Sequence, residues 1–173
     1  MIKEIEISGV KLITSSTCAE ESGVILERTF VMLKPSIVAR AMIGKVLSRI
    51  EDKGLKIVAM RLMWVTDEKA SKLYAIHKEK QFYQDLVRFI TSGPIVAMVI
   101  EGDEAVKVVR QMIGATDAKD AEAGTIRGDI ALSREKNAIH SSDSVENGKV
   151  ETDIFFSAEE LLKYRRADES WIY

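Results

Sequence analysis

The run Ile95–Glu101 constrains the fold more than any other part of the sequence. It reads Ile-Val-Ala-Met-Val-Ile-Glu and follows the turn Ser92-Gly93-Pro94. A continuous apolar run of this length, bounded by a turn, predicts a buried strand. A buried strand belongs to a sheet that helices cover, so the flanking segments decide the fold.

The flanking segments alternate between strand-like and helix-like patterns. Further strands are predicted at Arg28–Lys34, Leu55–Val65 and Ala138–His140. Helical spacing is found in Met42–Lys53, a segment after Asp67, Gln81–Ile90, Asp103–Ile113 and a segment after Asp143. The order β-α-β-α-α-β-α-loop-β-α predicts two interleaved β-α-β units, and hence an α+β fold of the ferredoxin-like βαββαβ kind.

A doubly wound parallel sheet is the alternative to this four-stranded antiparallel sheet. It would require a glycine-rich phosphate loop, and the sequence contains neither G-x-G-x-x-G nor G-x-x-x-x-G-K-[ST]. The segment Ala115–Arg134 has no sustained periodicity and is predicted to be a long loop. Loops of this length are usually functional or disordered.

Helix ends are marked by residues that cap or stop helices. Gly54 and Gly114 are predicted helix stops. Asp67 is a predicted N-cap, and Ser157 is expected to cap a short last helix. Asp143, with Glu146 three residues later, matches a capping box for a helix to residue 153.

Residues 1–26 differ from the rest of the chain and are predicted to be an N-terminal extension to a domain spanning 27–173. Ile5 and Ile7 alternate with polar residues, which indicates a short strand, and Gly9 can turn the chain into Val10–Ile13. The polar stretch 14–23 is predicted to be a loop or linker. The extension is expected to add a strand or to cover a contact between subunits.

Composition excludes several classes of protein. Of 173 residues, 46% are hydrophobic and 30% charged, with a net charge of −2, so a sequence-independent nucleic-acid binder is disfavoured. Cys18 is the single cysteine, which excludes an internal disulfide and fits a cytoplasmic location. No apolar run is long enough to cross a membrane, and the acidic N-terminal segment does not resemble a secretory signal.

His140 is the strongest candidate for chemistry. It lies at the end of a predicted strand and is followed by Ser141, Ser142 and Asp143. Its residue type is suited to act as nucleophile or acid/base at neutral pH, although a hydrogen-bonded structural histidine fits these neighbours equally well. No spacing of His, Cys, Asp and Glu resembles a closed metal site.

Three cations stand at element ends or in the long loop: Lys34, Arg110 and Arg127. Glycines on both sides of Arg127 suggest a bent backbone that presents its side chain to an anion, since Arg suits phosphate. The alternative is an ordinary loop ion pair with Asp129 or Glu122.

The aromatic residues of the middle segment are ambiguous. Phe82 and Tyr83 fit a core at least as well as a base-stacking platform. Tyr74 and His77 share a helix face, and His77 stands among charged residues and is expected to face solvent. The residues alone therefore predict an α+β domain with a candidate histidine, hydroxyls beside it and candidate phosphate-binding arginines.

These segments together resemble nucleoside diphosphate kinase. The run Asn137–Glu146 is similar to that family's N-x-x-H-G-S-D-S-x-E motif, and Gly124–Asp129 is the same as its G-T-I-R-G-D motif. Thr91–Val99, Ile113–Thr116 and Glu27–Pro35 also fit, in the family's order. The resemblance covers residues 27–173 with no obvious insertion.

The resemblance implies transfer of the γ-phosphate of a nucleoside triphosphate, such as ATP, to a nucleoside diphosphate, by a ping-pong mechanism through a phosphohistidine on His140. Ser142 and Glu151 would orient His140; this role of Glu151 does not follow from its spacing. Lys34 and Asn137 would hold the sugar hydroxyls, and Lys34 also the transferred phosphate. The remaining implied site residues are Arg110, Thr116 and Arg127 on the phosphates, Tyr74 near the transferred group, and Phe82 and Leu86 at the base.

The resemblance also implies partners. Mg²⁺ would arrive bound to the nucleotide phosphates rather than to a protein site. The family forms homohexamers, or alternatively tetramers, through the long loop and the sheet edge. The apolar end Trp171-Ile172-Tyr173 fits docking onto a neighbouring subunit.

The chain departs from the family pattern at several positions. Ser141 stands where the family usually has glycine, so strain is expected if that position needs a positive φ. Ser36 and Ile37 replace the usual Asp-Gly after Lys-Pro, and the loop from Thr116 to Gly124 lacks the usual prolines. An active but divergent enzyme is the first hypothesis, and a catalytically weak relative kept for interactions is the second.

Overall fold

The described residues of the computed structural model (2–7, 10–15 and 25–172) contain two separate sheets. The larger has four antiparallel strands in the order β4-β5-β3-β6. Their bounds are β3 (Leu26–Leu33), β4 (Lys56–Met63), β5 (Ile95–Asp103) and β6 (Ile139–Ser141). This order, with helices between the strands, confirms the predicted ferredoxin-like α+β fold.

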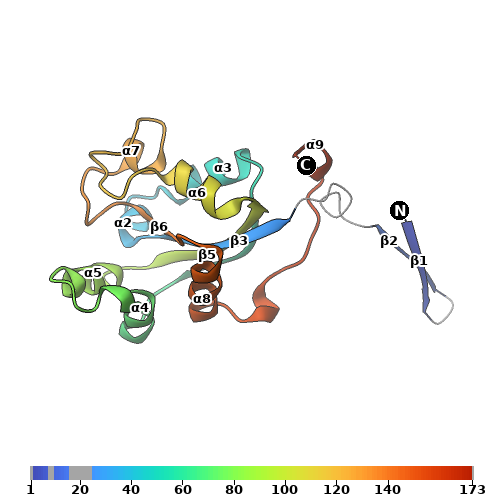
Figure 1. Ribbon diagram of the computed structural model, residues 1–173, viewed down its shortest axis with the longest axis horizontal. Coiled ribbons are helices and arrows are strands. Elements are labelled where there is room, and N and C mark those ends of the chain that lie inside the picture. The colour runs from blue at the N-terminus through green and yellow to red at the C-terminus, as the bar shows by residue number, and fades with distance from the viewer. Residues whose placement is uncertain (1, 8–9, 16–24, 173) are drawn as a thin grey trace.

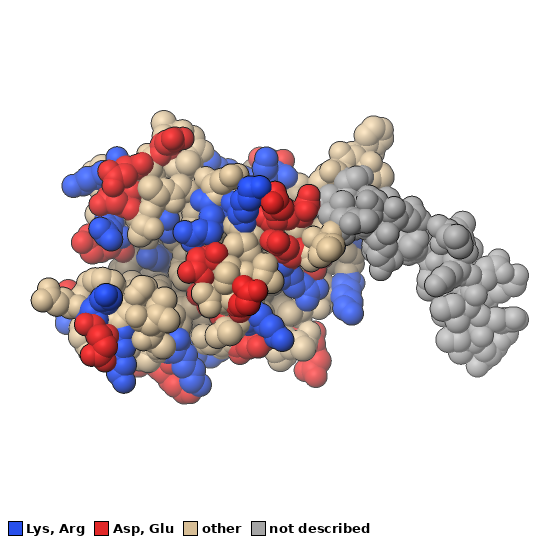
Figure 2. All heavy atoms as spheres, in the orientation of Figure 1, with Lys and Arg blue, Asp and Glu red and all other residues tan. Residues whose placement is uncertain are grey.

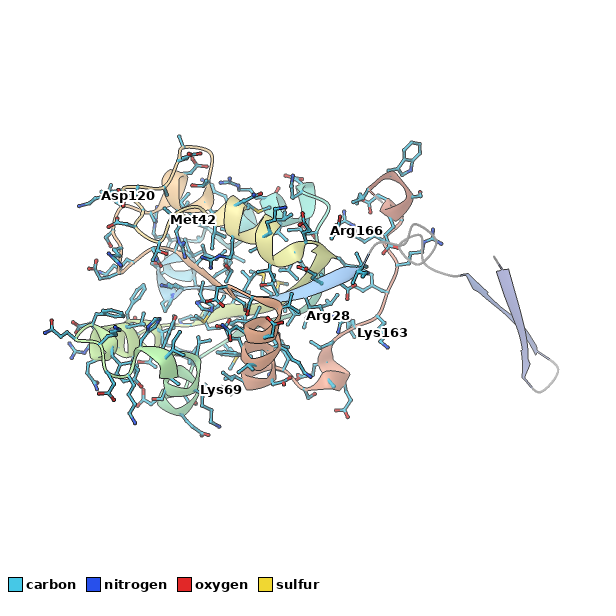
Figure 3. The ribbon with its side chains drawn as sticks, viewed as in Figure 1. Arg28, Met42, Lys69, Asp120, Lys163 and Arg166 are labelled. Atoms are coloured by element: carbon cyan, nitrogen blue, oxygen red, sulfur yellow. The ribbon has the colours of Figure 1, made fainter. Side chains whose placement is uncertain are left out.

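Helices cover both faces of this sheet, as Figure 1 shows. On one side lie α2 (Pro35–Ala39), α3 (Ile43–Asp52) and α6 (Ala105–Ile113). On the other lie α4 (Asp67–Leu73), α5 (Tyr83–Ile90) and α8 (Val145–Phe155). Figure 3 labels one residue of each layer, with Met42 at the start of α3 on one side and Lys69 of α4 on the other.

Alternation along β3 sorts its side chains into two cores, one on each face. Phe30 and Met32 pack with α4, α5 and α8, whereas Val31 and Leu33 pack with α3 and α6. His140 of β6 lies opposite Met32 in the pairing of the two strands. Residues directly opposite each other in a ladder share a face, so His140 faces α8.

The predicted helix stops are confirmed, whereas two predicted caps are wrong by one residue. Gly54 and Gly114 follow α3 and α6 with φ of 87° and 81°. The cap of α4 is Thr66, whose hydroxyl accepts from the Lys69 amide, so Asp67 is the first helical residue, where its charge favours the helix dipole.

The predicted capping box of α8 is also wrong. Ser144 is the N-cap and its hydroxyl accepts a hydrogen bond from the Asn147 amide. Asp143 instead accepts from the Asn147 side chain at 2.6 Å, and the helix runs to Phe155 rather than to residue 153. A capping box is present where Ser157 precedes a short 3-10 helix, η2 (Ala158–Glu160), as expected at that serine.

The segment predicted to be a long loop contains a short helix, α7 (Ile126–Ile130). A five-residue helix leaves no periodicity in the sequence. Thr125 caps it by accepting from the Gly128 amide, and a Cβ at Gly128 would collide with the Glu122 carbonyl, so the chain packs backbone against backbone here. Figure 3 shows the rest of this segment, labelled at Asp120, on the side of the sheet that carries α3.

The C-terminal segment after α8 is fastened to the sheet. Tyr164 donates its hydroxyl to the Ile57 carbonyl, and Arg166 donates to the Leu55 carbonyl at 2.8 Å. A last short helix, α9 (Glu169–Ile172), follows and contains Trp171 and Ile172 of the apolar end. Trp171 is 89% exposed, and Tyr173 lies outside the described residues.

The short strand predicted around Ile5 and Ile7 is present as β1 (Ile2–Ile7), and a second strand, β2 (Val10–Ser15), is also present in the extension. They pair antiparallel with each other, with Ile5 opposite Leu12, and form the second sheet. The predicted turn at Gly9 lies outside the described residues, as do residues 16–23 of the linker predicted for 14–23. Its first two residues, Thr14 and Ser15, belong to β2 instead.

None of the helices among the described residues has the length and apolar character needed to cross a membrane. Figure 2 shows basic and acidic side chains interspersed over the face in view, which agrees with the small net charge.

Candidate active site

A histidine held by a carboxylate is the centre of the candidate site. His140 Nε2 lies 2.9 Å from Glu151 Oε2, and the same oxygen accepts a 2.6 Å hydrogen bond from the Ser142 hydroxyl. All three groups are mostly shielded from solvent, with the His140 and Glu151 side chains 19% and 15% exposed. Because an ionised carboxylate can only accept, the contact places a hydrogen on His140 Nε2, and in the neutral ring the lone pair is then on Nδ1.

Close packing of α8 on β3 brings Glu151 to His140. A Cβ at Gly148 would lie 3.0 Å from the Arg28 carbonyl, so only a glycine lets the helix approach the strand this closely without adjustment. Glu151 lies three residues further on and therefore shares this helix face. The eleven-residue separation of His140 and Glu151 concealed this pairing in the sequence.

Aromatic rings surround the histidine on its buried side. The Phe30 and Tyr74 rings lie 6.1 and 6.0 Å from the His140 ring, centroid to centroid, and Tyr74 meets it edge-on. Phe30 also stacks on Phe155 of α8 at 4.8 Å. Phe30 was not among the predicted site residues. Its position in β3, on the same face as His140, is the feature that could have identified it.

Tyr74 brings an unpaired hydroxyl to the site. Its oxygen is buried and has no hydrogen-bond partner among the described residues. Burial, with a smaller contribution from the Glu151 charge, raises the pKa of this phenol well above its usual value. Tyr74 is therefore a neutral hydroxyl with a free donor, suited to a bound phosphate oxygen.

Lys34 directly follows β3 and is buried, and it forms no ion pair with a carboxylate among the described residues. Its Nζ donates to Asn137 Oδ1 at 2.6 Å and lies 6.0 Å from the centre of the Phe89 ring. Burial, and to a smaller extent the charge of Arg127, lower the pKa of Lys34 from 10.5 to about 7. An anion placed here would restore the charged form.

Asn137 uses both ends of its amide to join elements. Its oxygen accepts from Lys34, and its Nδ2 donates to the Thr116 carbonyl at 2.9 Å. Thr116 itself is exposed, at the start of the long connection from α6 to β6. Asn137, two residues before β6, thus ties the start of the strand that carries His140 to both Lys34 and Thr116.

Arg127 points inward from α7 and is held by main-chain carbonyls. It donates to Gly114 at 2.8 Å, to Ile139 at 2.9 Å and to Asn137 at 3.3 Å. Among the described ion pairs, Arg127 pairs with neither Asp129 nor Glu122, and Asp129 pairs with Arg49 instead. A guanidinium has five N–H groups, so Arg127 keeps two for a ligand.

Arg110 completes a cluster of cations. It is exposed in the last turn of α6, and its charge, after burial, is the second cause that lowers the pKa of Arg127 to about 10. Asp143 is the nearby carboxylate; its pKa is lowered by the Asn147 hydrogen bond and, less strongly, by the charges of Arg110 and His140. Lys34, Arg110 and Arg127 thus create a positive region next to His140.

A row of rings leads from His140 to the predicted base slot. The His77 ring lies 6.4 Å from Tyr74 and 5.6 Å from Phe82. Phe82 is 50% exposed, whereas Tyr83 beside it is in the core, so the two neighbours have different roles. His77 is half-buried against these rings, and the expectation of a solvent-facing side chain was wrong.

Leu86 lies one turn after Phe82 and packs partly on the core. A base-binding slot shared by Leu86 and Phe82 stays a prediction. Phe82 and Leu86 have no described contact with the cations. A ligand that contacts both the cations and these two side chains must therefore be long enough to reach from α5 to β6.

Ser141 does not create the strain that its replacement of glycine suggested. The described non-glycine residues with positive φ are Ala41, Glu104 and Ala138, so Ser141 has an ordinary strand conformation. Ala138, with φ of 70°, is the residue that turns the chain before His140, which explains why β6 begins at Ile139 rather than at Ala138.

Among the described residues, no group of three or more His, Cys, Asp and Glu side chains has the arrangement of a metal site. The charged groups around His140 are the carboxylates of Glu151 and Asp143 and the cations Lys34, Arg110 and Arg127. A site of this kind binds phosphates directly, and a divalent cation would be held largely by the phosphates themselves.

Comparison with known proteins agrees with this geometry. The family model described as nucleoside diphosphate kinase matches residues 27–161. The nucleoside diphosphate kinase of Archaeoglobus fulgidus is 51% identical over 148 residues, which is 86% of this chain and 98% of the relative. That of Sulfurisphaera tokodaii is 55% identical over 137 residues, 79% of this chain and 93% of the relative.

Solved structures give the same result. A halophilic nucleoside diphosphate kinase from Halobacterium salinarum, in complex with CDP, superposes with a TM-score of 0.83 at 47% sequence identity, covering 85% of this chain and 98% of that one. A family protein from Babesia bovis superposes with a TM-score of 0.82 at 40% identity, covering 85% of this chain and 99% of that one. The chain belongs to the nucleoside diphosphate kinase family, whose members are phosphotransferases.

Proposed function

We propose that this chain transfers the γ-phosphate of a nucleoside triphosphate to a nucleoside diphosphate by a ping-pong mechanism, with a phosphohistidine on His140 as the intermediate. The observation that carries the proposal is the Glu151 carboxylate that holds His140 Nε2 and Ser142 together. It leaves Nδ1 as the free nucleophile of a neutral ring.

In the first half-reaction, His140 Nδ1 attacks the γ-phosphorus of ATP. A P–N bond forms, the bond from the γ-phosphorus to the β–γ bridging oxygen breaks, and ADP leaves with that oxygen. The ring then carries a positive charge because Nε2 keeps its hydrogen. The Glu151 carboxylate, 2.9 Å away, stabilises that charge, and the Ser142 hydrogen bond keeps the carboxylate in place.

In the second half-reaction, a terminal β-phosphate oxygen of another nucleoside diphosphate attacks the same phosphorus. The P–N bond breaks and the electron pair returns to Nδ1, so His140 is regenerated in its first tautomer. Phosphoryl transfer of this kind depends on positioning and charge neutralisation, which the fixed ring and the neighbouring cations supply.

The proposed phosphate ligands are the groups that have donors to spare. Arg127 has two N–H groups left, Arg110 is exposed, and the buried Tyr74 hydroxyl has no described partner. Thr116 lies beside Asn137 and is proposed to contribute on the same side. Together they would hold the β- and γ-phosphates against His140.

Lys34 and Asn137 are proposed to hold the sugar hydroxyls, and Lys34 also the transferred phosphate. Their 2.6 Å hydrogen bond places an ammonium and an amide side by side, and both must turn toward the nucleotide when it binds. Phe82 is proposed to stack on the base, with Leu86 lining the slot. Stacking without base-edge hydrogen bonds accepts every base, so broad base tolerance is expected.

Mg²⁺ is proposed as the cofactor, carried by the nucleotide phosphates and water. When bound, it supplies further neutralisation of phosphate charge. The cations Lys34, Arg110 and Arg127 would bind the phosphates, and the phosphates would hold the ion. The chain's own residues would therefore select the phosphates, and the ion would enter with them.

A homohexamer, or alternatively a tetramer, is proposed as the assembly. Support comes from β4, an edge strand of the four-stranded sheet that exposes Met60, Leu62 and, just beyond it, Trp64 by 53%, 61% and 63%. Large apolar side chains in a row on an open edge favour pairing with another chain. Trp171, at the C-terminal end, is a second exposed apolar group. A cytoplasmic location fits a chain with one cysteine.

The test is incubation of the protein with γ-labelled ATP and Mg²⁺, followed by a search for acid-labile, base-stable label on the chain. The label should then leave as a triphosphate when a nucleoside diphosphate is added. His140→Ala should abolish labelling, whereas His77→Ala, the other histidine, should keep it. An unlabelled wild-type chain, or label that survives His140→Ala, would refute the proposal and favour a non-catalytic relative.

A further inference from the structure

Two arginines outside the candidate active site hold the helix that carries Arg127. Arg49 of α3 donates Nη1 to Asp129 Oδ2 at 2.8 Å and Nη2 to the Gly124 carbonyl. Arg40, the C-cap of α2, donates to the Ile130 carbonyl at 2.6 Å. These contacts reach both ends of α7, from Gly124 before its cap to Ile130 at its last turn.

Asp129 joins the contacts into one unit. Its second oxygen, Oδ1, accepts from the Gly124 amide at 2.8 Å, so Arg49 holds Gly124 both directly and through Asp129. A guanidinium that meets a carboxylate and a carbonyl with separate nitrogens is fixed in orientation as well as in distance. An ammonium could not make the same contacts.

The helix needs such support because it is too short to be stable alone. Its five residues are far below the length at which isolated helices persist in water. The neighbouring stretch from Thr116 to Gly124 contains no proline, so its backbone has little intrinsic stiffness. Tertiary contacts therefore supply the order of α7: the buried Ile126 packs in the core, and Arg40 and Arg49 hold the outer side of the helix.

These contacts with α7 determine the position of Arg127. It leaves α7 toward the interior, where three carbonyls orient its guanidinium. The carbonyls set the direction of the donors, and the position of α7 sets how far they reach. We propose that Arg49, with Arg40 beside it, is a positioning residue for Arg127, so that the outer contacts to α7 determine how tightly the phosphates are held.

This inference rests on the proposed function in one respect, the role of Arg127 as a phosphate ligand. Arg49 and Arg40 lie on the outer side of α7, so neither is proposed to touch the nucleotide. The Arg49 and Asp129 side chains are 32% and 39% exposed, so their ion pair alone contributes little to global stability. The expected effect is on affinity more than on folding.

The test compares Arg49→Ala and Arg49→Lys with Lys45→Ala, a matched loss of an exposed cation one turn earlier in α3. We expect Arg49→Ala to raise the KM for ATP and the Kd for ADP roughly 3- to 10-fold, with kcat changed less. Arg49→Lys should lie close to Arg49→Ala, because lysine cannot bridge Asp129 and Gly124. Lys45→Ala should match the wild type.

A double-mutant cycle separates positioning from general loosening. In an Arg127→Lys background, the effect of Arg49→Ala on ADP affinity should largely disappear, because the group being positioned is already altered. Amide exchange at Asp129 and Ala131 should be faster in Arg49→Ala with Arg127 intact. Size-exclusion chromatography of each variant identifies any change caused by altered assembly.

Unchanged ADP affinity in Arg49→Ala, or effects of the two substitutions that simply add, would overturn the inference. Binding of ADP is measured independently of phosphoryl transfer. A chain that binds ADP with the expected Arg49 dependence but forms no phosphohistidine would overturn the proposed function and leave the positioning role standing.

Discussion

At the scale of single residues, the candidate site is built from groups with unsatisfied donors or shifted protonation. Lys34 is buried, its Nζ is hydrogen-bonded only to an amide oxygen in the described contacts, and burial lowers its pKa to about 7. The Tyr74 hydroxyl is buried and unpaired. A chain tolerates such groups where a ligand completes them, because each costs stability in the free protein.

The protonation of Lys34 leads to a prediction about pH. Between about pH 7 and 10.5 the unfolded chain holds a proton on this amine that the folded chain lacks, so the Lys34 contribution to the free energy of unfolding rises with pH in that window. A bound phosphate favours the charged ammonium form of Lys34 over the neutral amine. Binding of ADP at pH 8 should therefore take up about one proton or less per subunit.

Calorimetric titration with ADP in two buffers of different ionisation enthalpy measures that uptake directly. Lys34→Gln keeps a hydrogen-bonding side chain of similar length but has no proton to gain. The uptake should fall to near zero in this variant. Equal uptake by Lys34→Gln and the wild type would show that another group titrates, and the assignment to Lys34 would be wrong.

At the scale of elements, the sequence predicted the strands, the helix stops and the order of the fold, because hydrophobic periodicity and glycine act locally. It failed at α7, whose five residues are too few to show periodicity and are held by tertiary contacts, among them those with Arg40 and Arg49. The candidate site was likewise predictable only in part. The motif around His140 could be recognised, whereas its contact with Glu151 depends on the packing of α8 and could not be derived from spacing.

Two helix ends form a matched pair for a stability prediction. After α2, the amides of Ala41 and Met42 bond to Val38 and Ile37 in the pattern that favours glycine, yet Ala41 occupies it with φ of 53°. Gly54 occupies the equivalent position after α3, with φ of 87°.

Replacement of Ala41 by glycine should stabilise the protein by about 0.5–1 kcal/mol, because glycine adopts a positive φ without the strain caused by a Cβ. The Ala41 side chain is exposed, so its removal loses no buried apolar contact. Gly54→Ala should destabilise it by about 1 kcal/mol or more, because a Cβ there would also press on Ile172 at 3.2 Å. Urea unfolding of both variants measures these changes. Shifts of the same sign in the two would contradict the explanation.

At the scale of the whole molecule, buried charges join the C-terminal segment to the sheet. Lys56 of β4 lies 2.8 Å from Glu101 and 3.4 Å from Glu169 of α9, and it donates to the Tyr164 carbonyl. The hydrogen bond to Glu101 is the main favourable contribution that raises the pKa of Lys56 against the cost of its burial. The C-terminal segment is therefore part of the folded domain, whereas β1 and β2 pair only with each other in the described sheets.

That pairing gives the last prediction its physical basis. A two-stranded sheet is marginally stable in water and has two open edges, so β1 and β2 need a further surface to pack against. Since they do not join the four-stranded sheet of their own chain, a neighbouring subunit is the expected surface. Removal of residues 1–24, which leaves β3 whole, should give a smaller assembly or lower the melting temperature by several degrees, as loss of about 1–2 kcal/mol would.

A chain with residues 1–24 replaced by a Gly/Ser segment of equal length controls for chain length alone. It should behave like the truncated protein if β1 and β2 make the contact. Light scattering with size-exclusion chromatography and thermal unfolding measure the two quantities. An unchanged oligomer together with an unchanged melting temperature in the truncated chain would refute a role for the extension in assembly, and phosphoryl transfer by that chain would then locate the whole activity in residues 25–173.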